Sequence, residues 1–589
     1  MDVKANPRKL QFGEFIADLQ SGELRRSGYA KPTVLPEQPL QVLQMLLKRP
    51  GEMVTRDELI RRLWPGGGFG DFDHGLNKVM NKLRDVLGDS VESPKFIETV
   101  ARRGYRFIAP VTHGTATSVV AVTTGIASLA VLPLVNATGD PETEYLSDGI
   151  SESIINSLSR FPNLRVSPRT SVFRYKGREP DLKKVGRDLK VRTVLTGKVI
   201  QRGDRLVVQT ELVDVANDAQ LWGGQFNRKL EDIFEVQEEV ARQISENLRL
   251  RLTPEDEKRL TKRSTQNRDA YQFFLKAQYH TNKMTPEGFQ RGMEYAKQAI
   301  EADPGYADAY VRMAAVYSGL GLLGFLRSAE AFPKAKAAVL KALEIDDSLA
   351  EAHAFLAAVM LFYDWDWSGA EHACKRALEL NPNYAEGHNL WSDWLFITGR
   401  REEAMAENQL AVELDPLSAG RNFNFGQKLL WSGDNERAIE QLKKALEFDA
   451  DFAWAHIGLA RAYACRGMYE ESLAACEKVA TLFGGNPHSR ALRSLILAMA
   501  GKTDEAKTIL NELNDRTKLD PMALIYSAES CSVLGEKDKS FQFLEAAYKD
   551  RVGLLIYLDV RPTFNNIRSD PRFADLRRRI GLPGCNDCA

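Results

Sequence analysis

The sequence predicts a multidomain fold in which an α+β domain comes first, a small α/β domain follows, and a long all-α solenoid completes the chain. Three observations support this prediction. Short alternating apolar runs flank three amphipathic helices before residue 110, strands and helices alternate again up to residue 252, and similar stretches recur every 34 residues in the remainder. A chain of 589 residues is also too long for a single hydrophobic core.

Charge and cysteine content locate one basic region and argue against a metal centre. The chain has 79 basic and 80 acidic residues, a net charge of −1, so nothing attracts it as a whole to nucleic acid or anionic lipid. Residues 1–110, however, hold 18 Lys and Arg against 14 Asp and Glu. Six cysteines are few, and the CNDC sequence at Cys585 and Cys588 has no second pair or histidine cluster in the chain to complete a site. We therefore predict no metal site and no cofactor.

The first elements of the N-terminal domain are a sheet and two helices. Alternating runs at residues 10–35, broken by Gly and Pro, predict a small antiparallel sheet. A helix is expected after Pro36, because apolar residues follow at helical spacing, and it should end at Pro50. A second helix should begin at Thr55, which can form a capping box with Glu58.

A third helix is expected at residues 73–87, and the segments FIETV and GYRFIAP after it predict a hairpin that completes a domain at residues 8–110. This third helix has two unlike faces. The apolar face consists of Leu76, Val79, Met80, Leu83, Val86 and Leu87. The polar face and the hairpin tip supply the candidate DNA-binding residues: His74, Asn77, Lys78, Asn81, Lys82, Arg84, Arg102 and Arg103. Asn can pair with adenine and Lys can reach guanine or phosphate, while tip arginines suit phosphate or a narrow minor groove.

These segments resemble the winged-helix effector domain of OmpR-type transcriptional regulators. The resemblance rests on VLQMLLKRPGEMVTRDELIRRLW, DFDHGLNKVMNKLRDVLGD and FIETVARRGYRFIAP, and the TVxxxGYRF hairpin is its most specific part. It implies that the third helix enters the major groove of double-stranded DNA and that the hairpin wing touches the backbone or minor groove. In the family, the loop between the second and third helices often touches RNA polymerase; here that loop is residues 64–72 and contains four glycines.

The domain order is similar to that of ToxR- or CadC-type regulators, in which the DNA-binding domain comes first and a sensor follows. No receiver domain precedes the winged helix, so phosphorylation in cis is not expected to control it. Those regulators have a transmembrane helix after the DNA-binding domain. Here residues 111–127 read as a linker, and residues 116–135 contain Thr, Ser, Gly125 and Pro133 and end in the strand-like LAVLPLV. No membrane insertion and a cytoplasmic location are therefore predicted.

Residues 128–252 predict the small α/β domain. SLAVLPLVN, LRVSP and the hairpin TVLTGKVIQRGDRLVVQTELVD read as strands, and helices are expected at residues 148–161, 181–189 and 233–252. The phrases LAVLPLVN, YLSDGISESIINSLS and VLTGKVIQRGDRLVVQTELVD resemble the TolB amino-terminal-like domain, a resemblance that implies no particular chemistry.

Catalytic residues are not predicted anywhere in the chain. Asp148 and Glu152 form a carboxylate pair four residues apart, but no histidine, GxSxG motif or phosphate loop accompanies them. Carboxylates at this spacing on a helix are usually solvated. The sequence therefore predicts a protein that is not an enzyme.

A 34-residue period organises residues 265–582, and residues 583–589 form a tail. The equivalent positions are Ala377, Ala411, Ala445, Val479, Leu513 and Ala547. This period is that of the tetratricopeptide repeat, a helix–turn–helix unit that stacks into a superhelix. The family resemblance implies that the inner helices line a concave groove, which is expected to take a protein or peptide partner. An inserted DWDW at residues 364–367 either marks a binding spot or packs its own turn.

Two functions fit these features. The first is a bacterial one-component regulator of transcription, whose winged helix reads promoter DNA, pairs as a homodimer on half-sites, and is controlled by a partner that the repeats bind. The alternative is a repeat scaffold or adaptor whose winged helix makes only protein contacts. A steep loss of duplex affinity with salt would distinguish the first from the second.

Overall fold

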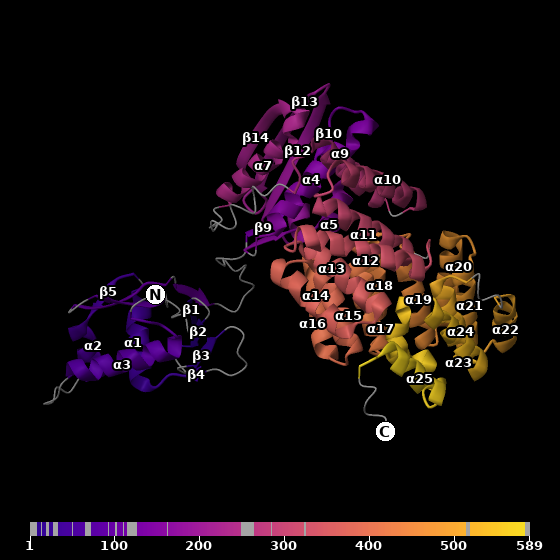
Figure 1. The fold of residues 1–589 in the computed structure, drawn as a ribbon. Helices are drawn as coiled ribbons and strands as arrows, with labels where there is room; N and C mark the ends of the chain where they lie inside the picture. The colour runs from indigo at the N-terminus through magenta and orange to yellow at the C-terminus, as the bar shows by residue number, and fades with distance from the viewer. Residues whose placement is uncertain are drawn as a thin grey trace. The chain divides into compact units, whose positions relative to one another are not determined.

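The computed structural model describes residues 9–583 except 13–14, 19–22, 27–32, 50, 65–71, 92–93, 101–102, 110, 115–126, 162, 249–263, 284, 323–324 and 514–518. The chain divides into two compact units, residues 1–124 and 125–589. A winged helix, an α/β domain and an all-α array follow one another along the chain, as the sequence predicts (Figure 1). The tail at residues 584–589 and most of the expected linker lie outside the described residues.

The first unit combines short strands with three helices. Its elements are β1 Lys9–Phe12, β2 Phe15–Asp18, β3 Glu23–Arg26, β4 Thr33–Val34, α1 Glu37–Lys48, β5 Met53–Thr55, α2 Arg56–Leu63, α3 Phe72–Leu87, β6 Ile97–Val100, β7 Gly104–Phe107 and β8 Val111–Gly114. The strands form a five-stranded antiparallel sheet in the order β4-β3-β2-β1-β8 and a three-stranded sheet in the order β5-β7-β6. The predicted sheet, helices and hairpin are therefore present.

Strand β8 corrects the predicted start of the linker. Residues 111–114 pair antiparallel with β1, with Lys9 opposite Gly114 and Phe12 opposite Val111. Without β8, the outer backbone groups of β1 would form a sheet edge, and β8 satisfies them. The Thr- and Gly-containing sequence VTHG gave no strand signal by itself, because long-range pairing rather than local preference makes it a strand.

The helices of the first unit begin where the sequence predicts and share one core. Thr55 Oγ1 accepts the Glu58 N–H at 3.3 Å, and Glu58 Oε2 accepts the Thr55 N–H at 2.8 Å, so the predicted capping box is present. The apolar faces of α1 and α3 pack together, and Leu43 and Leu83 are fully buried between them and the sheets. Helix α3 is thus held against the core of the first unit.

The second unit begins with the α/β domain. Its elements are β9 Ala127–Val131, β10 Val135–Asn136, η1 Pro141–Thr143, α4 Glu144–Ser159, β11 Leu164–Val166, α5 Arg169–Val172, η2 Phe173–Tyr175, α6 Leu182–Leu189, β12 Thr193–Arg202, β13 Arg205–Asp214, β14 Ala219–Lys229, η3 Leu230–Asp232 and α7 Ile233–Asn247. The sheet has the order β11-β9-β12-β13-β14, parallel among the first three strands and antiparallel among the last three. The predicted strands and helices are present, except that SLAVLPLVN forms two strands, β9 and β10. Helix α7 ends at Asn247, and residues 249–252 of the expected helix lie outside the described residues.

The α/β domain and the first repeat share one hydrophobic core. Helix α9 (Arg268–Thr281) contributes Leu275, which packs on α4 so closely that a Cβ added to Gly149 would meet its Cδ2 at 2.7 Å. The hydroxyl groups of Tyr271 and Ser153 lie 2.8 Å apart. Glycine at position 149 therefore permits the close approach of α4 and α9, and the repeat array starts as part of the α/β core.

The remainder of the second unit is a stack of antiparallel helix pairs (Figure 1). Its further elements are α10 Pro286–Ala302, α11 Ala307–Leu322, α12 Ser328–Ile345, α13 Ala350–Val359, η4 Met360–Asp364, α14 Trp367–Leu380, α15 Ala385–Ile397, α16 Arg401–Leu414, α17 Ala419–Trp431, α18 Asn435–Phe448, α19 Ala453–Cys465, α20 Tyr469–Phe483, α21 Pro487–Met499, α22 Thr503–Glu512, α23 Pro521–Val533, α24 Lys537–Lys549, η6 Gly553–Val560, η7 Pro562–Ile567 and α25 Pro571–Ile580. Small residues at the repeat positions, such as Ala411 and Ala445, are fully buried at helix crossings, as the 34-residue period predicts.

The C-terminal segment η6–η7 packs against the first helices of several repeats. One repeat position, on α15, α17, α19, α21 and α23, holds Asp393, Gln427, Arg461, Leu495 and Glu529, and all five side chains are buried. Asp393 accepts hydrogen bonds from Lys428 Nζ at 2.9 Å and from the Tyr557 hydroxyl at 2.9 Å. Glu529 Oε1 accepts from Arg461 at 2.9 Å and Arg561 at 3.1 Å.

Residues of η6 and η7 therefore occupy the part of the predicted peptide groove that these helices line. Tyr557 lies 4.4 Å from Trp431 between ring centroids, and one hydrophobic core joins α11–α15 to α23–α25. The DWDW tryptophans belong to this closure. Trp365 stacks on Tyr548 at 5.4 Å, and Trp367 Nε1 donates to the Ile580 carbonyl at 3.4 Å. Packing thus explains the DWDW insertion.

In the part of the chain that the structure describes, every helix is too short or too polar to cross a lipid bilayer. The expected linker before β9 is outside that part. Residues 127–131, within the mostly apolar stretch, form β9 between β11 and β12 in the α/β sheet, and a strand here is what the sequence predicts.

Candidate nucleic-acid interface

Helix α3 presents a polar face to solvent along its first three turns. His74, Asn77, Lys78, Asn81 and Lys82 are all exposed. The residues between them in the helical repeat, including Leu76, Met80 and Leu83, are buried in the core of the first unit. Five of the eight sequence-predicted residues therefore lie on one exposed surface, which we call the α3 face.

Arg84 does not belong to the α3 face, which corrects its predicted place there. Its side chain is 5 % exposed, and its guanidinium donates to the Ile97 carbonyl at 2.9 Å and to Thr99 Oγ1 at 2.8 Å. The helical period places residue 84 at the border of the two faces, and the border residue turned inward because β6 offers it oxygen acceptors. Arg84 therefore fastens α3 to the first strand of the wing.

A second arginine, Arg56, joins the start of α3 to the second strand of the wing. Its guanidinium donates to Asp73 Oδ1 at 2.8 Å, to Asn77 Oδ1 at 3.0 Å and to the Tyr105 hydroxyl at 2.9 Å. The Tyr105 hydroxyl also donates to Asn77 Oδ1 at 3.2 Å. These bonds use the carbonyl oxygen of the Asn77 amide and orient its NH2 group. Sequence reasoning missed Arg56 and Tyr105, because their partners are up to 49 residues away.

Asp89 fixes the path from α3 to the wing. Its carboxylate accepts backbone N–H groups of Lys95 at 2.6 Å, Phe96 at 3.2 Å and Ile97 at 2.8 Å. Such charge-assisted bonds are stronger than those between neutral groups. The wing is thus held at three points: Asp89, Arg84 and Arg56.

The wing tip carries one described cation. Arg103 is exposed in the turn between β6 and β7, and its carbonyl accepts the Arg56 N–H at 3.1 Å. Arg102 lies outside the described residues, as does the loop at residues 65–71 that the family resemblance relates to RNA polymerase. The α3 face and the Arg103 tip together form the candidate interface.

Replacing Arg84 with methionine is expected to destabilise the first unit by about 1–3 kcal/mol, since it leaves the Ile97 carbonyl without its donor. Thermal unfolding of the full chain would measure this. Lys82→Met is the matched control, because Lys82 is exposed two residues earlier on the same helix and should change stability by less than about 0.5 kcal/mol. Equal stability of the two variants would show that Arg84 does not fasten the wing.

Three family models match the chain. Residues 30–107 match "Transcriptional regulatory protein, C terminal". In fold and sequence, these residues are similar to an OmpR-type winged helix. Residues 125–243 match "HilA/YgeH-like transcriptional regulator, second domain", and residues 426–467 match "TPR repeat". The middle domain is thus HilA-like, while its resemblance to the TolB amino-terminal-like domain stays a prediction.

Several curated relatives are similar in sequence to part of this chain. The "Transcriptional regulator HilA" of Salmonella typhimurium is 25% identical over 425 residues, 71% of this chain and 72% of that protein. The "Cholera toxin homolog transcriptional activator" of Vibrio parahaemolyticus is 39% identical over 97 residues, 16% of this chain and 30% of the relative. The "Putative adenylate cyclase 3" of Rhizobium meliloti is 37% identical over 189 residues, which cover 32% of either chain. This chain therefore spans about a third of the cyclase-named relative.

Proposed function

We propose that this protein is a one-component regulator of transcription that reads promoter DNA with α3 and its wing and receives its signal through the repeat array. The observation that carries the proposal is the α3 face. Five polar or cationic side chains lie together on an OmpR-type helix that Arg84, Arg56 and Asp89 hold against the wing. A pre-oriented helix of this kind can place Asn and Lys against base edges and phosphates.

The repeats are proposed to bind a partner away from the groove face that η6 and η7 cover. Displacing that segment would expose Glu529, Arg461 and Arg561, which are at most 6 % exposed. Breaking a buried ion pair costs several kcal/mol. A partner would therefore gain more by docking on an open surface of the array.

A salt titration of the full-length chain on a random-sequence duplex tests the proposal. Binding that falls steeply between 50 and 200 mM salt is expected, because phosphate contacts release counterions with a slope of about −0.9 per contact in a log–log plot. Salt-independent binding, or none, would favour the adaptor alternative, in which the winged helix makes only protein contacts.

Replacing Asn81 with alanine is expected to reduce sequence preference and leave general affinity unchanged. A bidentate amide–adenine pair contributes about 1–3 kcal/mol of discrimination between bases. Affinity for the duplex sequence that the wild-type chain prefers should therefore fall by about tenfold or more, which is about 1.4 kcal/mol. Affinity for random duplex should stay the same. Competition binding with both duplexes measures the two effects. A parallel loss on both would assign Asn81 to backbone contact instead.

A further inference from the structure

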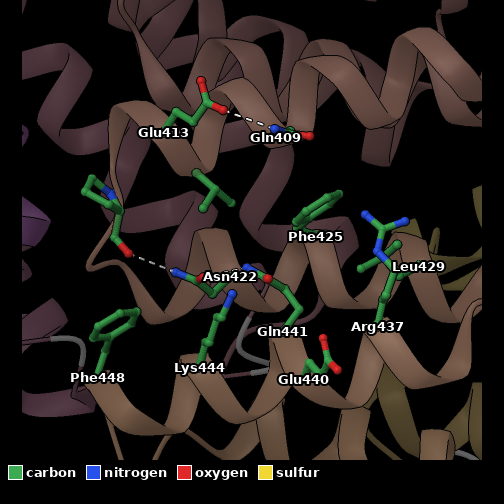
Figure 2. Close-up of a pocket in the computed structure, with 12 residues that line it drawn as sticks. Gln409, Glu413, Asn422, Phe425, Leu429, Arg437, Glu440, Gln441, Lys444 and Phe448 are labelled. Atoms are coloured by element: carbon green, nitrogen blue, oxygen red, sulfur yellow. Dashed lines mark hydrogen bonds between the residues drawn. The ribbon is translucent and has the colours of Figure 1, made fainter. Parts of the chain in front are cut away.

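A cavity of about 400 Å³ opens between α16, α17 and α18 (Figure 2). Its floor is apolar. Phe425 is 8 % exposed and Leu429 is 2 % exposed, while Val412 and Phe448 border the floor and are half-buried. A hollow of this size that combines an apolar floor with polar groups around it can hold a small ligand.

The cavity exists where a repeat position holds a smaller ring than its equivalent one unit earlier. Phe425 follows Trp391 by 34 residues. Trp391 is stacked on Trp394 at 4.9 Å and has Lys375 Nζ 5.5 Å from its ring centroid. An indole occupies more of the space between adjacent units than a phenyl ring does, so the native sequence itself offers a residue that would fill the cavity at position 425.

The polar link across the same unit also changes from charged to neutral. One unit earlier, His388 Nδ1 and Glu407 Oε2 lie 2.6 Å apart. At the cavity, Gln441 Nε2 donates to Asn422 Oδ1 at 2.6 Å, and both amides are buried. A buried pair of uncharged amides therefore lies beside the apolar floor, and the charged groups of the cavity lie at its rim.

The two walls of the rim have opposite charge. On α16, Glu413 accepts a hydrogen bond from Gln409 Nε2 at 3.1 Å. On α18, Arg437 and Lys444 point toward the cavity with Glu440 between them (Figure 2), so the residues that line this wall include one more cation than anion. Arg437 also donates to Asp434 Oδ2 at 3.2 Å. Walls of opposite charge favour an occupant with a cationic group on one side and an anionic group on the other.

The cavity also adjoins the contact between the array and the α/β domain. The Arg174 guanidinium donates to the Phe448 carbonyl and lies 5.3 Å from the Phe448 ring centroid. Arg165 donates to the Glu413 carbonyl at 3.4 Å. Beside them, Ser171 Oγ donates to Asp415 at 2.6 Å. An occupant that packs on Phe448 would therefore act directly on residues that hold the α/β domain.

We propose that this cavity binds a free α-amino acid with an apolar side chain. Its ammonium group would face Glu413, its carboxylate would face Lys444 and Arg437, and its side chain would pack on Phe425, Leu429 and Phe448. This inference names the signal in the proposed function and rests on it for its biological meaning. Amino-acid binding can be tested without DNA, so a failure of this inference can be distinguished from a failure of the proposed function.

Calorimetric titration of the full-length chain with L-leucine and with L-phenylalanine tests the proposal. Saturable one-site binding is expected for at least one of them. N-acetyl-L-leucine amide, which has the same side chain as leucine but neither charge, should bind at least tenfold more weakly. L-glutamate should also bind at least tenfold more weakly, because it lacks the apolar group. Amide hydrogen exchange at residues 164–176 should slow when the amino acid is bound, because Arg165 and Arg174 donate to the carbonyls of Glu413 and Phe448, which line the cavity.

Phe425→Trp is the decisive variant, since tryptophan stands at the equivalent position of the preceding unit. It should weaken amino-acid binding at least tenfold and leave salt-dependent DNA binding intact. Lys444→Gln, an exposed change that should not affect folding, should also weaken binding. Trp391→Phe should bind as the wild type does. Absence of binding by the wild type, or equal binding by Phe425→Trp, would overturn the proposal.

Discussion

Glu529→Gln is expected to lower the free energy of unfolding of the second unit by about 3–5 kcal/mol, the range found when one partner of a buried ion pair is removed. Glu529 is fully buried, and its Oε1 atom accepts from Arg461 at 2.9 Å, from Arg561 at 3.1 Å and from Thr563 Oγ1 at 2.6 Å. The glutamine side chain keeps the shape but leaves two buried guanidinium groups without a counter-charge. Denaturant unfolding followed by circular dichroism measures the change.

Asp538→Asn is the matched control for this prediction. Asp538 also pairs with an arginine, Arg572, at 2.8 Å, but its side chain is 85% exposed. Surface pairs contribute about 0–1 kcal/mol, so this control should unfold almost as the wild type does. If both variants lose the same small amount, the C-terminal segment is not held to α19 and α23 by charge.

The effect of Glu529→Gln should depend on pH. Burial alone would raise the pKa of Glu529, but Arg461 and Arg561 outweigh burial and lower that pKa. A carboxyl group with a folded pKa below its unfolded value of about 4.3 stabilises the fold above that pH. This contribution is lost as the pH falls through the folded pKa. The difference between wild type and variant should therefore be full at neutral pH and shrink in acid.

Periodic features of the fold could be predicted from the sequence, whereas pairings between distant residues could not. The 34-residue step, the capping box at Thr55 and Glu58, and the wing hairpin all depend on local spacing, and the structure contains them. Strand β8 and the closure of the array by η6 depend on partners far along the chain. The sequence did contain one signal for the closure. Asp393, Arg461 and Glu529 occupy the repeat position at which another unit has the buried Leu495, so the charged residues fall at a buried position.

In the candidate interface, too, local spacing could be predicted from the sequence and contacts between distant residues could not. Helical spacing placed His74, Asn77, Lys78, Asn81 and Lys82 correctly on an exposed face. It placed Arg84 wrongly, because spacing alone cannot show whether a border residue finds a buried acceptor such as the Ile97 carbonyl. The structure therefore separates the exposed residues proposed to contact DNA from those that hold the helix and wing in position.

Replacing Lys78, Lys82 and Arg103 together with alanine is expected to weaken binding to any duplex by about a hundredfold near 100 mM salt. The estimate takes about 1 kcal/mol for each of three charge-assisted phosphate contacts that are lost. All three side chains are exposed, Lys78 and Lys82 on α3 and Arg103 at the wing tip, so the change should not affect folding. The salt slope should also become shallower by about 2.7, at about 0.9 per contact.

A change in net charge alone could weaken binding to a polyanion, so the control must remove the same charge elsewhere. On the repeat array, Lys341 and Lys375 are exposed and Lys478 is half-buried, and each lies near an acidic partner at 2.5–3.0 Å. Their combined replacement with alanine should leave the salt slope unchanged, because long-range charge effects are screened beyond about 10 Å at 0.1 M salt. If both triple variants lose affinity equally, general electrostatic attraction and not the α3 face binds the duplex. If the first triple variant keeps the wild-type slope, α3 and the wing tip do not contact phosphate, and the winged helix of this chain serves a protein partner.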